Sequence, residues 1–273
     1  MIRPAVIGFL ALTASSPLAA APSEARISAD EAVAVQLAAD RGALIYAYDR
    51  AAWHGTDDLK AKLPDFPTKV GGWIVDGPAD AARLVFYDKD KSDPNAVYVA
   101  DFRGRELVSG RLLGAADDRS LSPIRKAMVA ARSAAAAALT AGKGKHCKPE
   151  AFNSVVLPPA APGGDTLVYF LTPQTDARAI PMGGHYRIDV APEGPAGKPR
   201  AFTKSCMEMP FENEKGERPE ALVITHLLDR TPTEIHVFSS LALGLPIFVA
   251  TTEGNRLWSV EGTRIRLVGK VPR

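Results

Sequence analysis

Hydrophobic and polar positions alternate with a period of two in several segments of the first half of the chain. Such alternation is typical of half-buried β-strands, whose successive side chains point to opposite faces of a sheet. It predicts four strands, at residues 72–76, 83–88, 96–102 and 106–112. The segments between them carry turn residues and are too short for helical crossovers, so we expect an antiparallel meander.

Signals for helices lie on either side of this meander. Ser28 is followed three residues later by Glu31, which is a capping box, and the pattern after it predicts a helix to about Trp53. A polar, proline-containing segment then continues to about residue 69. A second helix is predicted from Pro123, a favoured residue at the first helical position, through the alanine-rich run that follows.

The second half of the chain consists mostly of short apolar runs separated by proline and glycine. These runs predict strands at residues 154–157, 166–171, 185–190, 200–206, 221–226, 246–251, 256–260 and 264–268. One helix is predicted among them, near residues 232–243. Thr231 is its expected N-cap, Glu234 completes a capping box, and Gly244 stops it.

The predicted fold class is α+β, with antiparallel β-meanders and helices packed on one face. A Gly-Lys-Gly-Lys stretch is typical of a linker and places a boundary near residue 143. We therefore expect two subdomains. Residues 26–142 would form the helix, the four-stranded meander and the second helix, and residues 143–273 the strand-rich unit with the capped helix.

The first 25 residues have the three parts of a secretory signal peptide: a basic start, an apolar run at residues 5–12 and an alanine-rich exit. Cleavage is expected near residues 20–25. The apolar run is well short of the roughly 20 residues that a spanning helix needs, and no later stretch is long and apolar enough. The mature chain is therefore expected to be soluble, without membrane insertion, and to be periplasmic or secreted.

Charge is almost balanced, with 33 basic and 31 acidic residues. Tight binding to a nucleic acid requires many phosphates to be neutralised by lysine and arginine. A nucleic-acid partner is therefore not expected. The sequence leaves the partner unknown, with a protein and a small molecule as the open alternatives.

The chain has two cysteines, Cys147 and Cys206. Two thiols in one exported chain most simply form a disulfide in an oxidising compartment. Their spacing is not the Cys-x-x-Cys of a redox motif. A structural disulfide between them is therefore predicted.

Three residues near the C-terminal helix are the candidates for catalysis. His226 ends a predicted strand, Asp229 lies in the following loop, and His236 lies in the predicted helix. Side chains of these types could converge in a hydrolase, with or without a metal ion. Glu234 is assigned to the helix cap, and residues 234 and 236 lie about 200° apart around a helix, so a shared metal is disfavoured. No cofactor is predicted.

Sequence motifs for nucleophilic catalysis, phosphate loops and dinucleotide binding do not occur in the chain. The sequence therefore favours a non-catalytic binding or interaction module of the periplasm, and the alternative is an exported, metal-dependent or metal-free hydrolase. Trp53 and Trp73 are expected to pack in the core, and a groove between the first helix and the first sheet is the alternative.

Overall fold

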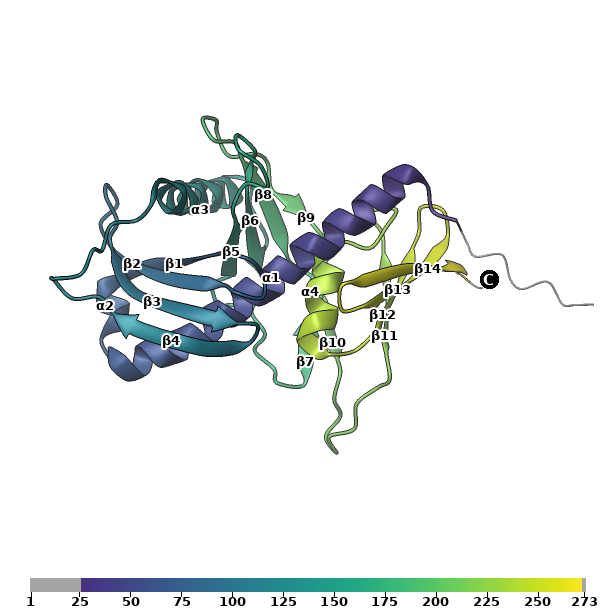
Figure 1. The fold of residues 1–273 in the computed structure, drawn as a ribbon. Helices are drawn as coiled ribbons and strands as arrows, with labels where there is room; N and C mark the ends of the chain where they lie inside the picture. Colours follow the sequence, from purple (N-terminus) through teal and green to yellow (C-terminus); the bar gives the residue numbers. More distant parts are fainter. Residues whose placement is uncertain (1–25, 272–273) are drawn as a thin grey trace, which may run out of the picture.

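The computed structural model describes residues 26–271, which form an α+β fold with helices packed on mostly antiparallel sheets (Figure 1). The α+β class predicted from the sequence is confirmed. The helices are α1 (Ala29–Lys62), α2 (Phe66–Lys69), α3 (Pro123–Ala141) and α4 (Glu234–Leu243). The predicted signal peptide lies outside the described residues.

The strands are arranged in three four-stranded sheets and one two-stranded pair. The first sheet has the order β1 (Val70–Asp76), β2 (Arg83–Asp88), β3 (Ala96–Arg103) and β4 (Glu106–Leu112). The second has the order β5 (Asn153–Leu157), β6 (Thr166–Leu171), β8 (Tyr186–Val190) and β9 (Arg200–Ala201). The third has the order β11 (Leu222–His226), β12 (Ile247–Thr251), β13 (Arg256–Glu261) and β14 (Arg264–Lys270), and β7 (Ala179–Pro181) pairs with β10 (Glu208–Pro210).

The first sheet is the predicted antiparallel meander, and its strand boundaries match the alternating segments closely. The third sheet differs, because β11 and β12 run parallel. The chain can make this parallel pair because α4 crosses between the two strands, as in a βαβ unit.

α1 is longer than the sequence predicted, because it continues past Trp53 to Lys62. The additional turns bury Leu59 completely against the first sheet, so packing outweighs the polar character of this segment. Pro64 then ends the helix, since the residue before a proline is disfavoured in the helical conformation.

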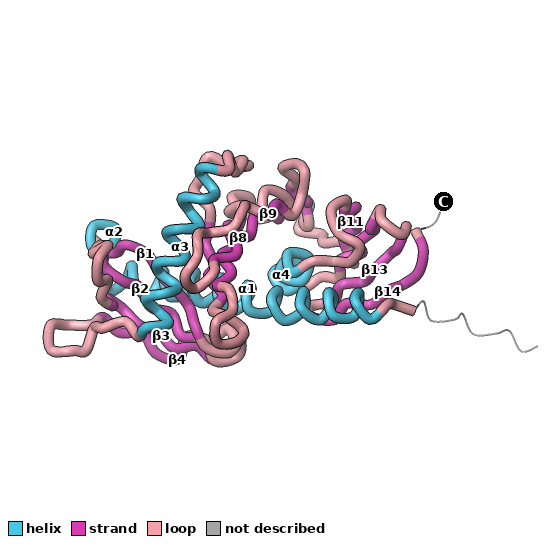
Figure 2. Tube along the Cα trace, turned by 90° about the horizontal axis from the view of Figure 1, so that it is seen from above, coloured by secondary structure: helices cyan, strands magenta, loops and turns pink. Residues whose placement is uncertain are grey.

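α1 also crosses the entire molecule (Figures 1 and 2). Its N-terminal half packs against α4 and its C-terminal half against the first two sheets. Gly42 makes the close approach to α4 possible, because a Cβ there would lie 2.8 Å from the backbone oxygen of Glu234 and would overlap Val237.

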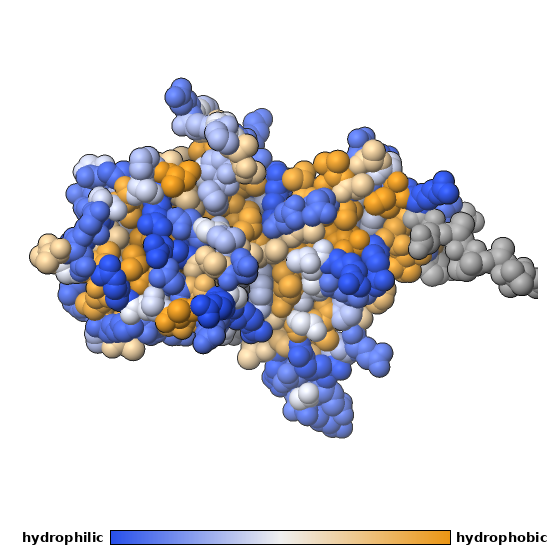
Figure 3. All heavy atoms as spheres, viewed as in Figure 1, coloured by the Kyte–Doolittle hydropathy of each residue, from blue (hydrophilic) through white to orange (hydrophobic). Residues whose placement is uncertain are grey.

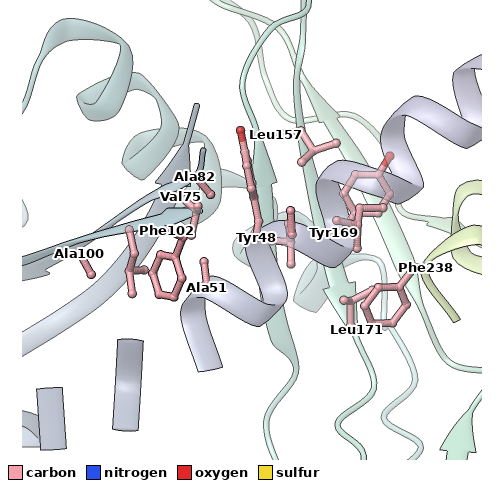
Figure 4. Packing of buried hydrophobic residues seen from close by; sticks show 14 of the residues in the cluster. Tyr48, Ala51, Val75, Ala82, Ala100, Phe102, Leu157, Tyr169, Leu171 and Phe238 are labelled. Atoms are coloured by element: carbon pink, nitrogen blue, oxygen red, sulfur yellow. The ribbon is translucent and has the colours of Figure 1, made fainter. Parts of the chain in front are cut away.

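The first two sheets lie edge to edge, with β1 beside β5, and α1 and α3 cover opposite faces. Alternate strand residues therefore belong to different cores: Val75 and Val155 face α1, whereas Ile74 and Val156 face α3. In Figure 4, the α1 residue Tyr48 lies between apolar side chains of the first sheet and those of the second.

The hydrophobic core between α1 and the first two sheets contains residues from both sides of the predicted boundary near residue 143. Phe102 comes from the first sheet, and Tyr169 and Leu171 come from the second (Figure 4). The division into two subdomains stays a prediction.

α4 begins two residues later than predicted. Thr233, not Thr231, is the N-cap, and His236, not Glu234, completes the capping box. The physical reason is that the Glu234 carboxylate has ionic partners in the second sheet, so a neutral imidazole accepts the hydrogen bond from the cap N–H instead.

The predicted strand at residues 200–206 is reduced to two residues, because the chain turns there and Thr203 donates a hydrogen bond to the backbone oxygen of Ser205 at 2.9 Å. The short pair β7 and β10 was not predicted.

No helix within residues 26–271 is long and apolar enough to span a bilayer. On the face shown in Figure 3, apolar residues gather over the N-terminal part of α1 and the third sheet. The exposed ones in these elements include Val33, Leu37 and Val268.

Candidate functional site

A cleft of about 860 Å³ lies where the C-terminal half of α1 meets the seam between the first two sheets. Its walls come from α1, α2, β1, β2, α3, the start of β5 and the loop at residues 174–177. Clefts of this size are typical of sites for one small organic molecule. The charged and aromatic residues of its walls are Asp49, Arg50, Trp53, Lys60, Phe66, Trp73, Phe86, Arg132 and Asp176.

Two glycines of β1 shape the seam. Gly71 is the extra residue of a β-bulge opposite β2, and bulges of this kind re-aim the neighbouring side chains. A Cβ on Gly72 would overlap the Tyr87 hydroxyl and lie 2.8 Å from Nη1 of Arg132. The missing side chain therefore allows the guanidinium of Arg132, which comes from α3, to reach the cleft.

The α1 wall of the cleft carries an arginine stacked on a tryptophan. The guanidinium of Arg50 lies 4.5 Å from the ring centre of Trp53, which is a cation–π contact, and the indole is 56% exposed. Arg50 also donates from Nη2 to Asp49 at 2.7 Å. Its Nε–H is one of two buried side-chain polar groups without a hydrogen-bond partner in the described residues, a situation that costs roughly 1–3 kcal/mol.

The wall formed by β1 and α3 repeats this pairing. The guanidinium of Arg132 lies 5.1 Å from the ring centre of Trp73. Arg132 donates from Nε to the hydroxyl of Ser154 at 2.8 Å and from Nη1 to that of Tyr87 at 3.2 Å. These neutral partners fix the orientation of the guanidinium without cancelling its charge.

Asp49 is the buried acid of the cleft. Burial raises the pKa of its carboxyl, although the neighbouring Arg50 acts in the opposite direction.

The three candidates for catalysis do lie close together. Nε2 of His226 is 2.9 Å from Oδ2 of Asp229, and the rings of His226 and His236 meet edge to face with centres 4.8 Å apart. Both histidines are almost fully buried. A catalytic role for this group stays a prediction.

The side chains of this group are engaged in contacts that stabilise the fold. Burial lowers the pKa of His236 to about 3, and its Nδ1 accepts the hydrogen bond from the backbone N–H of Thr233 in the helix cap. Burial alone would raise the pKa of Asp229, but hydrogen bonds from His226 and Arg200 and their charges lower it overall. Within residues 26–271, no three His, Cys, Asp or Glu side chains are placed to hold a metal ion.

Glu234, which the sequence assigned to the cap, instead joins α4 to the second sheet. Its Oε1 accepts hydrogen bonds from Tyr169 and from Arg187, each at 2.9 Å, while Nη1 of Arg200 lies 3.7 Å away. Arg200 also donates to Asp229 at 2.8 Å. This buried ionic network thus includes one of the catalytic candidates and fixes α4 to the molecule.

The predicted disulfide between Cys147 and Cys206 is confirmed, with an S–S distance of 2.07 Å. It fastens the segment after α3 to the segment that leads into β10. A disulfide is consistent with a location outside the cytoplasm.

Removing this disulfide is expected to lower the free energy of unfolding by about 4 kcal/mol, because a sequence separation of 59 residues closes a long loop in the unfolded chain. Urea unfolding of a Cys147→Ser, Cys206→Ser double variant measures the loss. The wild-type protein in the presence of a reductant should behave like the variant. A loss below about 1 kcal/mol would contradict the chain-entropy account.

The sequence left a groove near Trp53 and Trp73 only as the alternative to burial in the core, and the cleft lies there. Sequence reasoning missed the two arginines that stack on these rings. Arg50 is three residues from Trp53, so an i, i+3 pairing on a helix could have indicated it. Arg132 is far from Trp73 in sequence, and only the fold brings the two together.

Comparison of the chain with protein-family models, with curated proteins and with solved structures found no match.

Proposed function

We propose that the protein is an exported binding module, periplasmic or secreted, that holds a small molecule in the cleft between α1 and the seam of the first two sheets. The cleft is the observation that carries this proposal. It has the volume of a small-molecule site, and it combines the exposed indole of Trp53 with guanidinium groups at fixed positions.

The catalytic alternative has less support. The rings of His226 and His236 are buried, and His236 is held neutral and engaged in the helix cap. None of the residues that line the cleft belongs to this group. A general base needs access to the proton that it removes, and a binding role places no such demand on these residues.

A fragment screen by ligand-observed NMR tests the binding proposal. Thr56 lines the cleft on α1, so Thr56→Trp should fill the cleft and abolish binding of fragments that recognise it. Thr140→Trp on α3 is the matched control, because both hydroxyls donate to the backbone oxygen four residues earlier. We expect fragment hits in the wild type and in Thr140→Trp that disappear in Thr56→Trp.

Hits that persist unchanged in Thr56→Trp would place binding elsewhere and contradict the proposal, as would the absence of any hit. Export is tested on the same protein by intact mass after recovery from a bacterial periplasm. A chain that begins near residues 21–26 supports export, and a full-length chain contradicts it.

A further inference from the structure

Arg132 is a cation in the cleft without a countercharge. Its side chain is half-buried, and within the described residues its guanidinium forms no ion pair, its side-chain partners being the hydroxyls of Ser154 and Tyr87. Arginine stays charged at all physiological pH values and has five N–H donors. The hydroxyls of Ser154 and Tyr87 occupy donors on Nε and Nη1, and no described residue accepts from Nη2.

Several independent contacts hold the guanidinium of Arg132 in one position. The indole of Trp73 supports one face of the guanidinium, two hydroxyls fix its edge, and the missing side chain of Gly72 provides the space. A surface arginine that only solubilises the protein has no need of such an arrangement. Fixed donors that keep a full charge are what binding sites use to recognise carboxylate, sulfonate or phosphate groups.

The remaining charges in the cleft do not cancel Arg132. Asp49 is engaged with Arg50 at 2.7 Å, and Lys60 lies near Asp57 at 3.8 Å, on the surface of α1. Asp176, in the loop, is exposed, and its Oδ1 accepts a hydrogen bond from the backbone N–H of Arg178 at 2.8 Å.

Arg50 lies on the same wall as Trp53, with its guanidinium stacked on the indole and paired with Asp49. Its Nε–H has no acceptor in the described residues but is buried, so a ligand in the cleft does not reach it. The cleft thus combines the fixed positive charge of Arg132 with an exposed aromatic ring.

The size of the cleft and the exposed indole define the rest of the ligand. A volume of about 860 Å³ is far larger than an inorganic anion, so the ligand needs an organic part. An indole that is 56% exposed gives a flat apolar surface on which another ring can stack.

We propose that the cleft binds a small organic anion, with its acidic group on Arg132 and a flat ring against Trp53. This inference rests on the proposed function and adds the chemical class of the ligand.

The test compares two probes that have the same shape and different charge. Titration calorimetry on the full mature chain measures binding of 2-naphthoate, an anion, and of 2-naphthamide, its neutral counterpart. We expect 2-naphthoate to bind at least about tenfold more tightly, which corresponds to the energy of one well-placed charged hydrogen bond. The preference should weaken as the salt concentration rises.

Variants at position 132 assign this preference to the guanidinium. Arg132→Gln should remove the difference between the two probes, and Arg132→Lys, which keeps the charge, should retain part of it. A purely structural role would make these two variants alike. Arg105→Gln is the matched control for net charge, because Arg105 is exposed in the turn between β3 and β4. It should keep the full preference.

The outcomes separate this inference from the proposed function. Equal binding of both probes, lost in Thr56→Trp, would overturn the anion inference and leave a binding cleft. If neither probe binds while other fragments bind in the cleft, the anion inference is likewise overturned and the binding cleft remains. A preference that survives Arg132→Gln would overturn the assignment to Arg132. If no fragment binds in the cleft, the proposed function itself fails.

Discussion

Replacement of Glu234 by alanine is expected to lower the free energy of unfolding by about 3–5 kcal/mol, the cost of breaking a buried ion pair from one side. The carboxylate is 4% exposed and accepts hydrogen bonds from Tyr169 and Arg187. Its removal leaves the phenol without its acceptor and Arg187 with only Asp189 as a carboxylate partner. Urea unfolding of the purified variant measures the loss.

Glu253→Ala is the matched control. Glu253 pairs with Arg230 at 2.7 Å, but these side chains are 59% and 69% exposed, so its removal should cost less than about 1 kcal/mol. If the two variants lost similar stability, the network around Glu234 would not have the role in fixing α4 that its burial indicates.

Acid is expected to destabilise the protein through its buried histidines. Burial lowers the pKa of His185 to about 4 and that of His236 to about 3, from an ordinary value of 6.5. The unfolded chain therefore takes up protons at these rings near pH 6.5, whereas the folded chain resists until the pH is much lower. The stability that the neutral rings contribute is complete above pH 6.5 and falls as the pH is lowered toward 4.

His185 gives the cleanest measurement of this effect. Its ring accepts the N–H of Thr172 at 3.1 Å and meets the backbone oxygen of Pro181 at 3.0 Å, so it is held neutral in one orientation. Between pH 7 and pH 4 the wild type should lose about 3 kcal/mol more than His185→Gln, which cannot take up the proton. The raised pKa of Asp49 acts in the opposite direction, but it is common to both proteins and cancels in the comparison. Parallel pH profiles would contradict this assignment.

Local patterns predicted the first sheet well because its order follows the sequence. Each strand of the meander pairs with its neighbour in the chain. The alternation of hydrophobic and polar residues and the turn residues between the strands are therefore enough to predict this sheet. The same holds for the start of α1, where Ser28 and Glu31 form the predicted capping box. The disulfide followed from there being two cysteines.

The errors arose where tertiary contacts outweighed local preference. Glu234 fits a capping box in sequence, but its carboxylate pairs with Arg187, a residue in another sheet. The polar segment after Trp53 is helical because Leu59 finds an apolar partner surface. The short pair β7 and β10 consists of three residues on each side, which is too little for a period to be recognised.

The cleft was only partly predictable for the same reason. The aromatic residues favoured core packing and left a groove as the alternative. The charges of the cleft depend on the contact between α1, β1 and α3, which no local pattern describes. Gly72 shows this most clearly. In the sequence it is an ordinary glycine at the start of a strand, and only the positions of the Tyr87 hydroxyl and of Arg132 explain why a larger residue would not fit.

The length and position of α1 also have a consequence for how the chain reaches its native state. Glu31, near the start of this helix, pairs with Arg256, which is 225 residues later in the sequence. At about 5–20 residues per second, synthesis of the intervening chain takes roughly 10–45 s. Until α4 and the third sheet have been synthesised, the N-terminal half of α1 has neither to pack against. Completion of the fold must therefore wait for almost the whole polypeptide, and dependence on such distant pairings slows folding.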